Sequence, residues 1–183
     1  MGEDGVAERW VFGSRFVAGI PVDRARLRTT LAYRITPALQ AGLEYNPLDD
    51  DLGIIANWRA IDETEHRPAL LLGTSSDRIG TDSGRSYYAT LSKDLESVLD
   101  LPIAPYAGIA YGEFDDELVG VGGLSVRWAD DVTSYHMWDG HNLHHVLEKA
   151  FGRHSVGLML VDLDGEYYAG LTYSVSFSMP WER

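Results

Sequence analysis

Cysteine is absent from the 183 residues of this chain, which excludes disulfide bonds and thiolate metal sites. Long apolar runs are absent as well, since none approaches the roughly 20 residues that a transmembrane helix needs. Basic residues are few, with 15 Lys and Arg against 28 Asp and Glu and a formal net charge of −13. This balance argues against nucleic acid as a partner. A membrane barrel is still compatible with these absences, because its alternating strands keep the hydropathy low.

Residues 1–10 lack the basic and apolar segments of a secretion signal. Two explanations fit this: a cytoplasmic protein, or an exported protein whose signal has been removed and whose Met1 was added. The strand patterns described below favour the second explanation. We expect residues 1–8 to be a disordered N-terminal segment, residues 9–178 a single domain, and residues 179–183 a C-terminal tail.

Glycine is abundant, with 19 residues, and aromatic residues make up 11% of the chain. Most of the chain alternates apolar and polar residues with a period of two, which is the pattern of a half-exposed strand. In the last segment, Leu171 and Tyr173 share one face, and Thr172 and Ser174 share the other. Strands are predicted at 9–20, 25–36, 39–46, 52–61, 67–75, 85–94, 103–113 and 118–128, with two more within 154–177 joined by a tight Asp-Gly-Glu turn.

The region 129–151 has two interpretations, a helix over 141–151 or two strands at 132–138 and 141–151. The position of the turns favours two strands. Tight turns at 36–38, 129–131 and 152–153 then lie at one end, and acidic loops at 21–24, 46–51, 75–84, 114–117 and 163–166 lie at the other. The sequence therefore predicts an all-β, transmembrane, up-and-down antiparallel barrel of about twelve strands, with ten as the alternative.

The less apolar face of the strands distinguishes a membrane barrel from a soluble one. It consists mainly of Gly, Ser, Thr, Ala and Asn, which suits a polar lumen, whereas a soluble barrel shows Lys, Glu and Thr to water. A charge facing lipid costs about 2–4 kcal/mol at the bilayer midplane, and the acidic residues concentrate in loops. Aromatic residues near strand ends suit interfacial girdles, namely Trp10, Tyr33, Tyr45, Trp58, Tyr111, Trp128 and Phe177. A soluble lipocalin-like barrel that binds an apolar ligand is the alternative.

The final strand resembles the C-terminal insertion signal of the outer-membrane β-barrel proteins of Gram-negative bacteria. The matching residues are Tyr168, Gly170, Tyr173, Val175 and the terminal aromatic Phe177. The resemblance implies a location in the bacterial outer membrane, contact with its lipid and lipopolysaccharide, and recognition by the barrel-assembly machinery during insertion. The chain departs from the family pattern because it continues past Phe177 to Arg183. The resemblance names no substrate and no cofactor.

Seven charged residues have the parity of lumen positions: Arg15, Arg28, Arg34, Glu44, Arg59, Arg127 and Glu148. One interpretation is a constriction that attracts anions or gates a narrow pore. The other is a set of internal ion pairs that plug the lumen, because a buried charge must be paired. Arg34 with Glu44, across the tight hairpin, is the pair that we expect. A barrel of this size leaves room for a thin water path.

Histidines cluster near the end of the chain, at His136, His141, His144, His145 and His154. On a strand His144 points away from His141 and His145, so we expect neither a metal site nor a cofactor. The loop acids could bind divalent cations that bridge lipopolysaccharide, although solvated loops explain them more simply. They are Asp49, Asp50, Asp51, Asp115, Asp116 and Glu117.

Ser134 and His136 share one strand face, and with Asp130 or Asp131 they could form part of a hydrolytic site. No local motif of outer-membrane lipases or proteases accompanies them, and no catalytic residue is assigned. The sequence therefore favours a non-enzymatic outer-membrane barrel, either structural or a narrow passive pore. A lipid- or peptide-hydrolysing barrel enzyme is the alternative.

Overall fold

The computed structural model describes residues 8–179. Apart from Glu8 and Met179, the predicted disordered segment 1–8 and tail 179–183 lie outside the described residues. These residues form the strands β1 (Trp10–Val17), β2 (Leu27–Arg34), β3 (Leu39–Asn46), β4 (Asp51–Ile61), β5 (Ala69–Ser76), β6 (Arg85–Ser92), β7 (Ile103–Gly112), β8 (Glu117–Ala129), β9 (Val132–Trp138), β10 (Leu143–Phe151), β11 (His154–Leu163) and β12 (Glu166–Phe177). They also form two helices, α1 (Asp23–Arg26) and α2 (Glu96–Leu99). No helix in residues 8–179 is long and apolar enough to cross a membrane.

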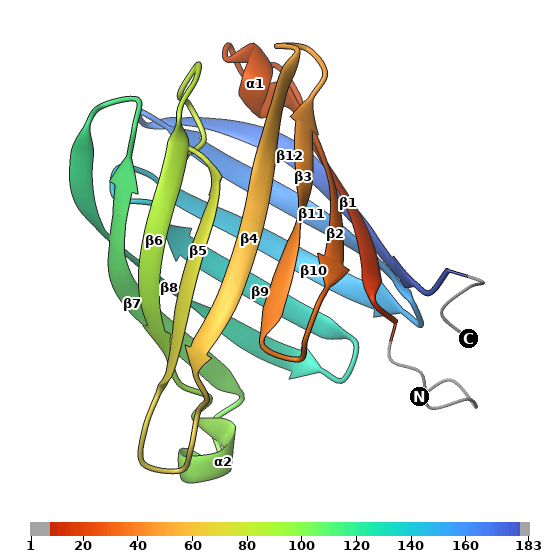
Figure 1. Cartoon of the computed structure of the whole chain (residues 1–183), viewed down its shortest axis with the longest axis vertical. Coiled ribbons are helices and arrows are strands. Elements are labelled where there is room, and N and C mark those ends of the chain that lie inside the picture. Colours follow the sequence, from red (N-terminus) through yellow and green to blue (C-terminus); the bar gives the residue numbers. More distant parts are fainter. Residues whose placement is uncertain (1–7, 180–183) are drawn as a thin grey trace.

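Each strand pairs antiparallel with the next, and β1 pairs with β12 to close the barrel (Figure 1). At this seam Trp10 lies opposite Phe177, and Val17 lies opposite Gly170. Closure removes the unpaired sheet edges that an open sheet would present. The all-β up-and-down barrel of twelve strands over residues 8–179 is therefore confirmed, and the ten-strand alternative is wrong.

The region 129–151 forms the two strands β9 and β10, and the helical interpretation of 141–151 is wrong. β10 pairs with β9 on one side and with β11 on the other. Its residues alternate accordingly: Leu143 and Leu147 are exposed, whereas His144 and Val146 are buried. A helix would bring residues three and four apart onto one face, but this segment buries every second residue.

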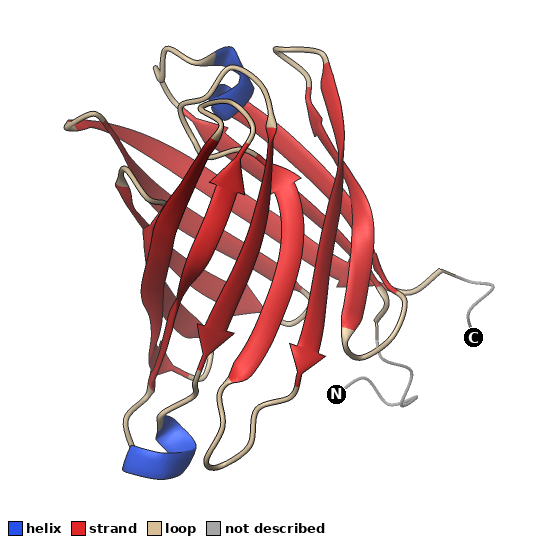
Figure 2. Ribbon diagram, turned by 60° about the vertical axis from the view of Figure 1, so that its left-hand side comes forward, coloured by secondary structure: helices blue, strands red, loops and turns tan. Residues whose placement is uncertain are grey.

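The two ends of the barrel differ. Helix α1 and the loops 47–50, 77–84, 113–116, 139–142 and 164–165 lie at one end, and the chain termini, helix α2 and the turns 35–38, 130–131 and 152–153 lie at the other (Figure 2). The predicted sorting of tight turns and acidic loops is therefore confirmed. The terminal end also carries two longer connections, 62–68 and 93–102, and the second contains helix α2.

The buried core lies inside the barrel, beneath helix α1. Val17, Ile20, Val146, Met159 and Val161 form it, and Ala25 of α1 completes the cluster. Ile79 of the 77–84 loop and Tyr168 of β12 pack against it. This end of the lumen is thus filled on one side by apolar side chains, which holds α1 and the loop in the mouth.

The outer face of the barrel is apolar and exposed. Large apolar side chains that stand free on it include Leu31, Leu43, Ile54, Trp58, Tyr87, Ile109, Trp128, Leu147, Leu158 and Leu171. A soluble monomer rarely exposes a contiguous apolar surface of this extent. In β12, Tyr173 belongs to this outer face, whereas Gly170 approaches the backbone of Phe16 at the seam.

Candidate functional site in the lumen

A cavity of about 780 Å³ occupies the lumen, lined mainly by β5 to β10 and also by residues of β1, β2, β11 and β12. It reaches from Asp77 and Asp139 at the loop end to Ser92 and Ala104 near the terminal end. One part of its wall is apolar, with Val119, Val121, Tyr135, Met137, Val146 and Met159. Hydroxyl groups line other parts, from Ser75, Ser86, Thr90, Ser125 and Thr172. The cavity can therefore hold water or a small solute that combines apolar and polar groups.

Glu44 is the centre of the polar side of the lumen. Its side chain is 0% exposed. Arg28 donates to one of its carboxylate oxygens, and Arg85 donates to the other at 2.5 Å. The hydroxyl of Ser76 donates to the oxygen that Arg28 also contacts, at 3.2 Å. A fully buried carboxylate is stable only with such partners, because an unpaired buried charge is expensive.

Arg15 adds a further cation to this cluster. It lies directly opposite Arg28 in the pairing of β1 with β2 and lines the cavity. Its Nε is buried and has no hydrogen-bond partner among the described residues. The cluster therefore holds three arginines, Arg15, Arg28 and Arg85, around the one carboxylate of Glu44, and it carries an excess of positive charge.

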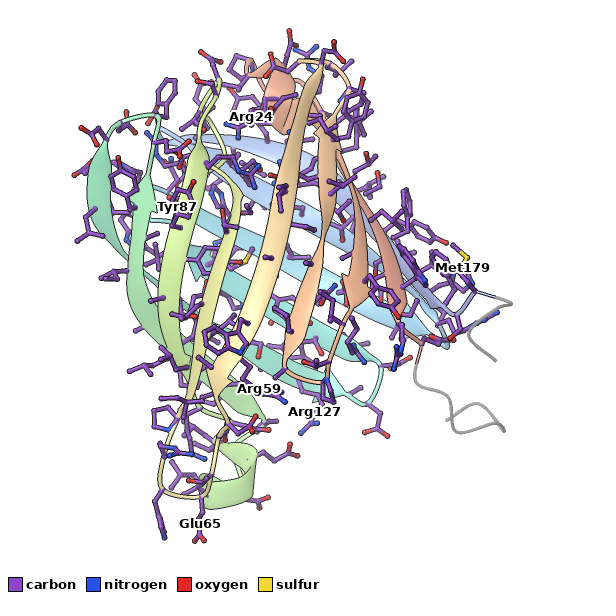
Figure 3. All side chains as sticks on the ribbon, in the orientation of Figure 1. Arg24, Arg59, Glu65, Tyr87, Arg127 and Met179 are labelled. Atoms are coloured by element: carbon purple, nitrogen blue, oxygen red, sulfur yellow. The ribbon has the colours of Figure 1, made fainter. Side chains whose placement is uncertain are left out.

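Arg24 fastens helix α1 over the loop-end mouth, where Figure 3 labels it. Its Nε lies 3.3 Å from a carboxylate oxygen of Asp51. Its terminal nitrogens donate to the hydroxyl of Thr81 at 3.1 Å and to the carbonyl of Gly84 at 2.5 Å. Arg24 thus joins α1, β4 and the 77–84 loop, and these contacts narrow the mouth.

The expected pair of Arg34 with Glu44 is wrong. The register of β2 with β3 places Thr30 opposite Glu44 and Gln40 opposite Arg34. Arg34 is therefore four residues further along β2 than the partner of Glu44, or about 13 Å away. The side chain of Arg34 is exposed at the terminal end.

The other lumen candidates do not join the cluster. Arg59 is at the terminal end, paired with Asp62 at 2.6 Å, and Arg127 pairs there with Glu96 of α2 (Figure 3). Glu148 is half-buried on β10 and makes no ion pair or hydrogen bond within the described part of the chain. Of the seven predicted residues, the structure brings together Arg15, Arg28 and Glu44.

Sequence parity misses Arg85 and Ser76, which complete the cluster. Successive residues of a strand point to opposite faces, and Ser75 and Ser86 point into the lumen, where they line the cavity. Alternation therefore predicts that Ser76 and Arg85 point outward. The pairing of β4 with β5 begins only at Ala56 and Thr74, so Ser76 lies beyond the paired segment. The two side chains turn inward through this opening toward Glu44. The alternation of apolar and polar residues along one strand does not indicate that β4 and β5 are unpaired at this end.

His136 and His145 lie side by side, with their Nδ1 atoms 2.7 Å apart, and the other clustered histidines contact different residues. His144 bonds to Asp139 in the loop-end turn, and His154 bonds to the hydroxyl of Tyr173. Residues 8–179 contain no group of three metal-ligating side chains. Five of the six loop acids have protein partners: Asp50 accepts from Tyr45, Asp51 pairs with Arg24, Asp115 pairs with Arg78, Asp116 accepts from Tyr111, and Glu117 lies 3.7 Å from Nε2 of His141.

Asp139 organises the turn between β9 and β10. One of its carboxylate oxygens accepts from the backbone N–H groups of His141 and Asn142, and the other bonds to Nε2 of His144 at 2.9 Å. Burial alone would raise the pKa of Asp139. The hydrogen bonds from His144, Asn142 and His141 outweigh burial and hold this pKa below its usual value of 3.8.

A carboxyl whose folded pKa is lowered stabilises the fold above its unfolded pKa, and this contribution is lost as the pH falls through the lower folded value. We therefore expect Asp139→Asn to reduce the free energy of unfolding at about pH 6, with a much smaller reduction at about pH 3. Urea unfolding of both proteins in detergent at each pH measures this. An equal effect at both pH values would contradict the role of the ionised carboxylate.

Comparison with known proteins agrees with this architecture. No family model matches the sequence, and no curated protein sequence is similar to it. Among solved structures, the chain is similar to the NanC porin in its rhombohedral crystal form, with a TM-score of 0.54 and 12% sequence identity. The match covers 93% of this chain and 100% of the porin chain. At the level of the fold, the chain is a closed twelve-strand antiparallel β-barrel similar to that of this porin.

Proposed function

We propose that the protein is an integral outer-membrane β-barrel whose lumen forms a narrow passive pore that favours anions. The observation that carries the proposal is the inner wall, where Arg28 and Arg85 bind the carboxylate of Glu44 and Arg15 lies beside Arg28. Rings and patches of like charge on a pore wall select the opposite ion. The acids Asp115 and Glu117 lie further out, at the loop-end rim of the cavity.

The exposed outer surface supports a membrane location. Leu31, Leu43, Ile54 and Leu158 stand on it without cover, and lipid would bury them favourably. The lumen face carries hydroxyl and charged side chains beside its apolar part, whereas the outer face is apolar, which is the arrangement of a membrane barrel. Lipid and lipopolysaccharide are then the surrounding partners, and the chain termini face the periplasm, as short turns do in this class. A chain that stays soluble without detergent and migrates identically with and without heating would overturn this part.

The loop-end mouth supports a narrow rather than a wide pore. Ile20 before helix α1, Arg24 of the helix and Ile79 of the 77–84 loop pack into it. A barrel of this strand number is wider than one filled by side chains and narrower than a general porin. Small anions with an apolar part suit the cavity, because it is lined both by arginines and by apolar side chains such as Tyr135 and Met159.

The ion selectivity of Arg15→Gln tests the pore. Arg15 has no carboxylate partner of its own, so its removal takes away positive charge without freeing an acid. We expect the anion preference, measured as the reversal potential under a salt gradient in planar bilayers, to fall several-fold. The matched control is Arg127→Gln, which removes a cation paired with Glu96 at the terminal end and should leave selectivity unchanged.

Three results would contradict the proposal. Absence of single-channel conductance by the folded wild type would indicate a purely structural barrel. Unchanged selectivity in Arg15→Gln would remove the arginine wall from the ion path. An equal change in Arg127→Gln would assign the selectivity to the overall charge of the protein.

A further inference from the structure

Three polar side chains form a hydrogen-bonded row on the outer face of the barrel. Ser134 and His136 lie two residues apart on β9, and His145 lies opposite His136 on β10. Oγ of Ser134 is 3.2 Å from Nε2 of His136, and Nδ1 of His136 is 2.7 Å from Nδ1 of His145. The indole N–H of Trp128 donates to the same Oγ at 2.9 Å.

The hydrogen bonds in this row are all satisfied when each group donates to the next, from Trp128 to Ser134, from Ser134 to His136 and from His136 to His145. An indole nitrogen only donates, so Oγ of Ser134 accepts from Trp128 and its own proton is available for Nε2 of His136. A neutral imidazole that accepts at Nε2 carries its proton at Nδ1. His136 therefore donates from Nδ1 to His145. In this arrangement His136 can take the proton of Ser134 while His145 orients the ring and stabilises its charged form.

The surroundings of the row are apolar. Leu147 lies opposite Ser134, Leu160 lies opposite His145, and both leucines are exposed. Polar and ionisable groups on a lipid-facing surface are costly, and such residues mark functional sites by default. Apolar side chains would serve the fold equally well at these positions. The presence of three hydrogen-bonded polar side chains at these positions therefore indicates a chemical role on the outer, lipid-facing surface of the barrel.

The depth of the row also matches a lipid substrate. Ser134 is the third residue of β9, or about 7 Å from the strand end at the terminal side of the barrel. This depth corresponds to the boundary between the hydrocarbon core and the headgroup region. Trp128 beside it is 67% exposed and has the position of an interfacial aromatic. The ester linkages of a glycerolipid lie at this boundary.

We infer that Ser134, His136 and His145 form an acyl-ester hydrolase site that faces the membrane and acts on membrane lipid. The sequence suggested Asp130 or Asp131 as the third group. The structure gives this position to His145 and pairs Asp131 with Lys149 instead. This site lies on the opposite face of the sheet from the lumen cluster, so it is independent of the pore.

The reaction proceeds in two steps. Oγ of Ser134 attacks the ester carbonyl as its proton passes to Nε2 of His136, and the carbonyl electron pair moves to oxygen. That pair returns as the bond to the alcohol breaks, and the alcohol leaves with the proton from His136. Water then attacks the acyl-serine, gives one proton to His136, and releases the fatty acid as that proton returns to Oγ. The sum is ester plus water to acid plus alcohol.

Access to Ser134 requires movement of Trp128. Ser134 is only 6% exposed, with the indole N–H bonded to its oxygen. The indole itself is largely exposed, so it is free to turn toward lipid. We expect Trp128→Ala to increase the rate at which a serine-reactive fluorophosphonate labels Oγ of Ser134.

Two measurements on the full chain in detergent test the assignment. One is release of fatty acid from phosphatidylethanolamine in mixed micelles, and the other is labelling by a fluorophosphonate, located by mass spectrometry. We expect both activities in the wild type and neither in Ser134→Ala. His136→Gln should lower the release by about 10²–10⁴-fold. The matched control is Ser14→Ala, a serine on β1 that pairs with Thr29 and Tyr173 rather than with a histidine.

His145 is a positioning residue, and its variants separate orientation from general damage. His145→Gln keeps an acceptor for Nδ1 of His136, whereas His145→Leu removes it. We expect the leucine variant to be about tenfold or more slower than the glutamine variant, with equal heat-shifted migration on gels. No fatty acid release by the wild type, release that survives Ser134→Ala, or label on another residue would each overturn the inference.

Discussion

Glu44→Ala should lower the free energy of unfolding by about 3–5 kcal/mol, because it leaves a buried cluster of cations without its carboxylate. In the wild type, Arg28 and Arg85 each donate to one oxygen of Glu44, and Arg15 lies beside them. Removal of the carboxylate also frees the hydroxyl of Ser76. The three arginines then repel one another in a lumen of low effective dielectric.

Urea unfolding of the purified barrel in detergent measures this loss. The matched control is Glu148→Ala, which removes a half-buried lumen carboxylate that makes no ion pair among residues 8–179. We expect the control to change stability by less than about 1 kcal/mol. The double variant Glu44→Ala with Arg28→Ala should recover part of the loss, since it removes one uncompensated charge. Similar losses from Glu44→Ala and from the control would show that the cluster does not stabilise the barrel.

The same substitution has an expected effect on conduction. With Glu44 gone, the three arginines of the cluster have no carboxylate among them, so the anion preference of the pore should increase in Glu44→Ala. Arg34 is at the other end of β2 from this cluster, so it has no part in the effect. Planar-bilayer recordings measure this change together with that of Arg15→Gln, which has the opposite sign.

Gly108→Ala should destabilise the barrel by about 3 kcal/mol or more, because the added methyl group meets backbone on the neighbouring strand. A Cβ at this position would lie 2.0 Å from the carbonyl oxygen of Ala89 and 2.7 Å from Cα of Thr90. Backbone cannot turn aside as the end of a side chain can. The pairing of β6 with β7 would therefore have to open, and a barrel distributes such a distortion around its whole circumference.

Gly120→Ala is the matched control for Gly108→Ala. Gly120 lies on β8, opposite Ile109, and a Cβ there meets nothing within 4 Å. We expect its effect to stay within about 0.5 kcal/mol. Unfolding in urea and the temperature at which the folded gel band disappears measure both variants. Equal tolerance of the two substitutions would contradict the close approach of β6 and β7 at Gly108.

The two proposed activities use the two faces of one sheet. The lumen face carries Arg15, Arg28 and Glu44, and the outer face carries Ser134, His136 and His145. Tests of conduction and of ester hydrolysis are therefore separable by mutation. Arg15→Gln should leave hydrolysis unchanged, and Ser134→Ala should leave conduction unchanged.

The sequence by itself determined which segments are strands and which face of each strand looks outward. The period of two is a local property, so it is visible in segments such as 154–177 and it decides burial wherever a strand is regular. Alternation also gave the even strand count, because tight turns and acidic loops sort to opposite ends only with two strands in 129–151. The same pattern placed Arg15, Arg28 and Glu44 on the inner face and Ser134 with His136 on one face.

Only the tertiary structure decided which of these residues meet. The register of β2 with β3 separates Arg34 from Glu44, and the opening between β4 and β5 admits Arg85, whose parity points the other way. The register of β9 with β10 places His145 beside His136. Register depends on contacts between strands, and a one-residue slip exchanges every partner. The sequence of one strand does not determine its register with the neighbouring strand. The charged cluster and the pair of His136 and His145 could therefore be identified only from the pairing of the strands in the closed barrel.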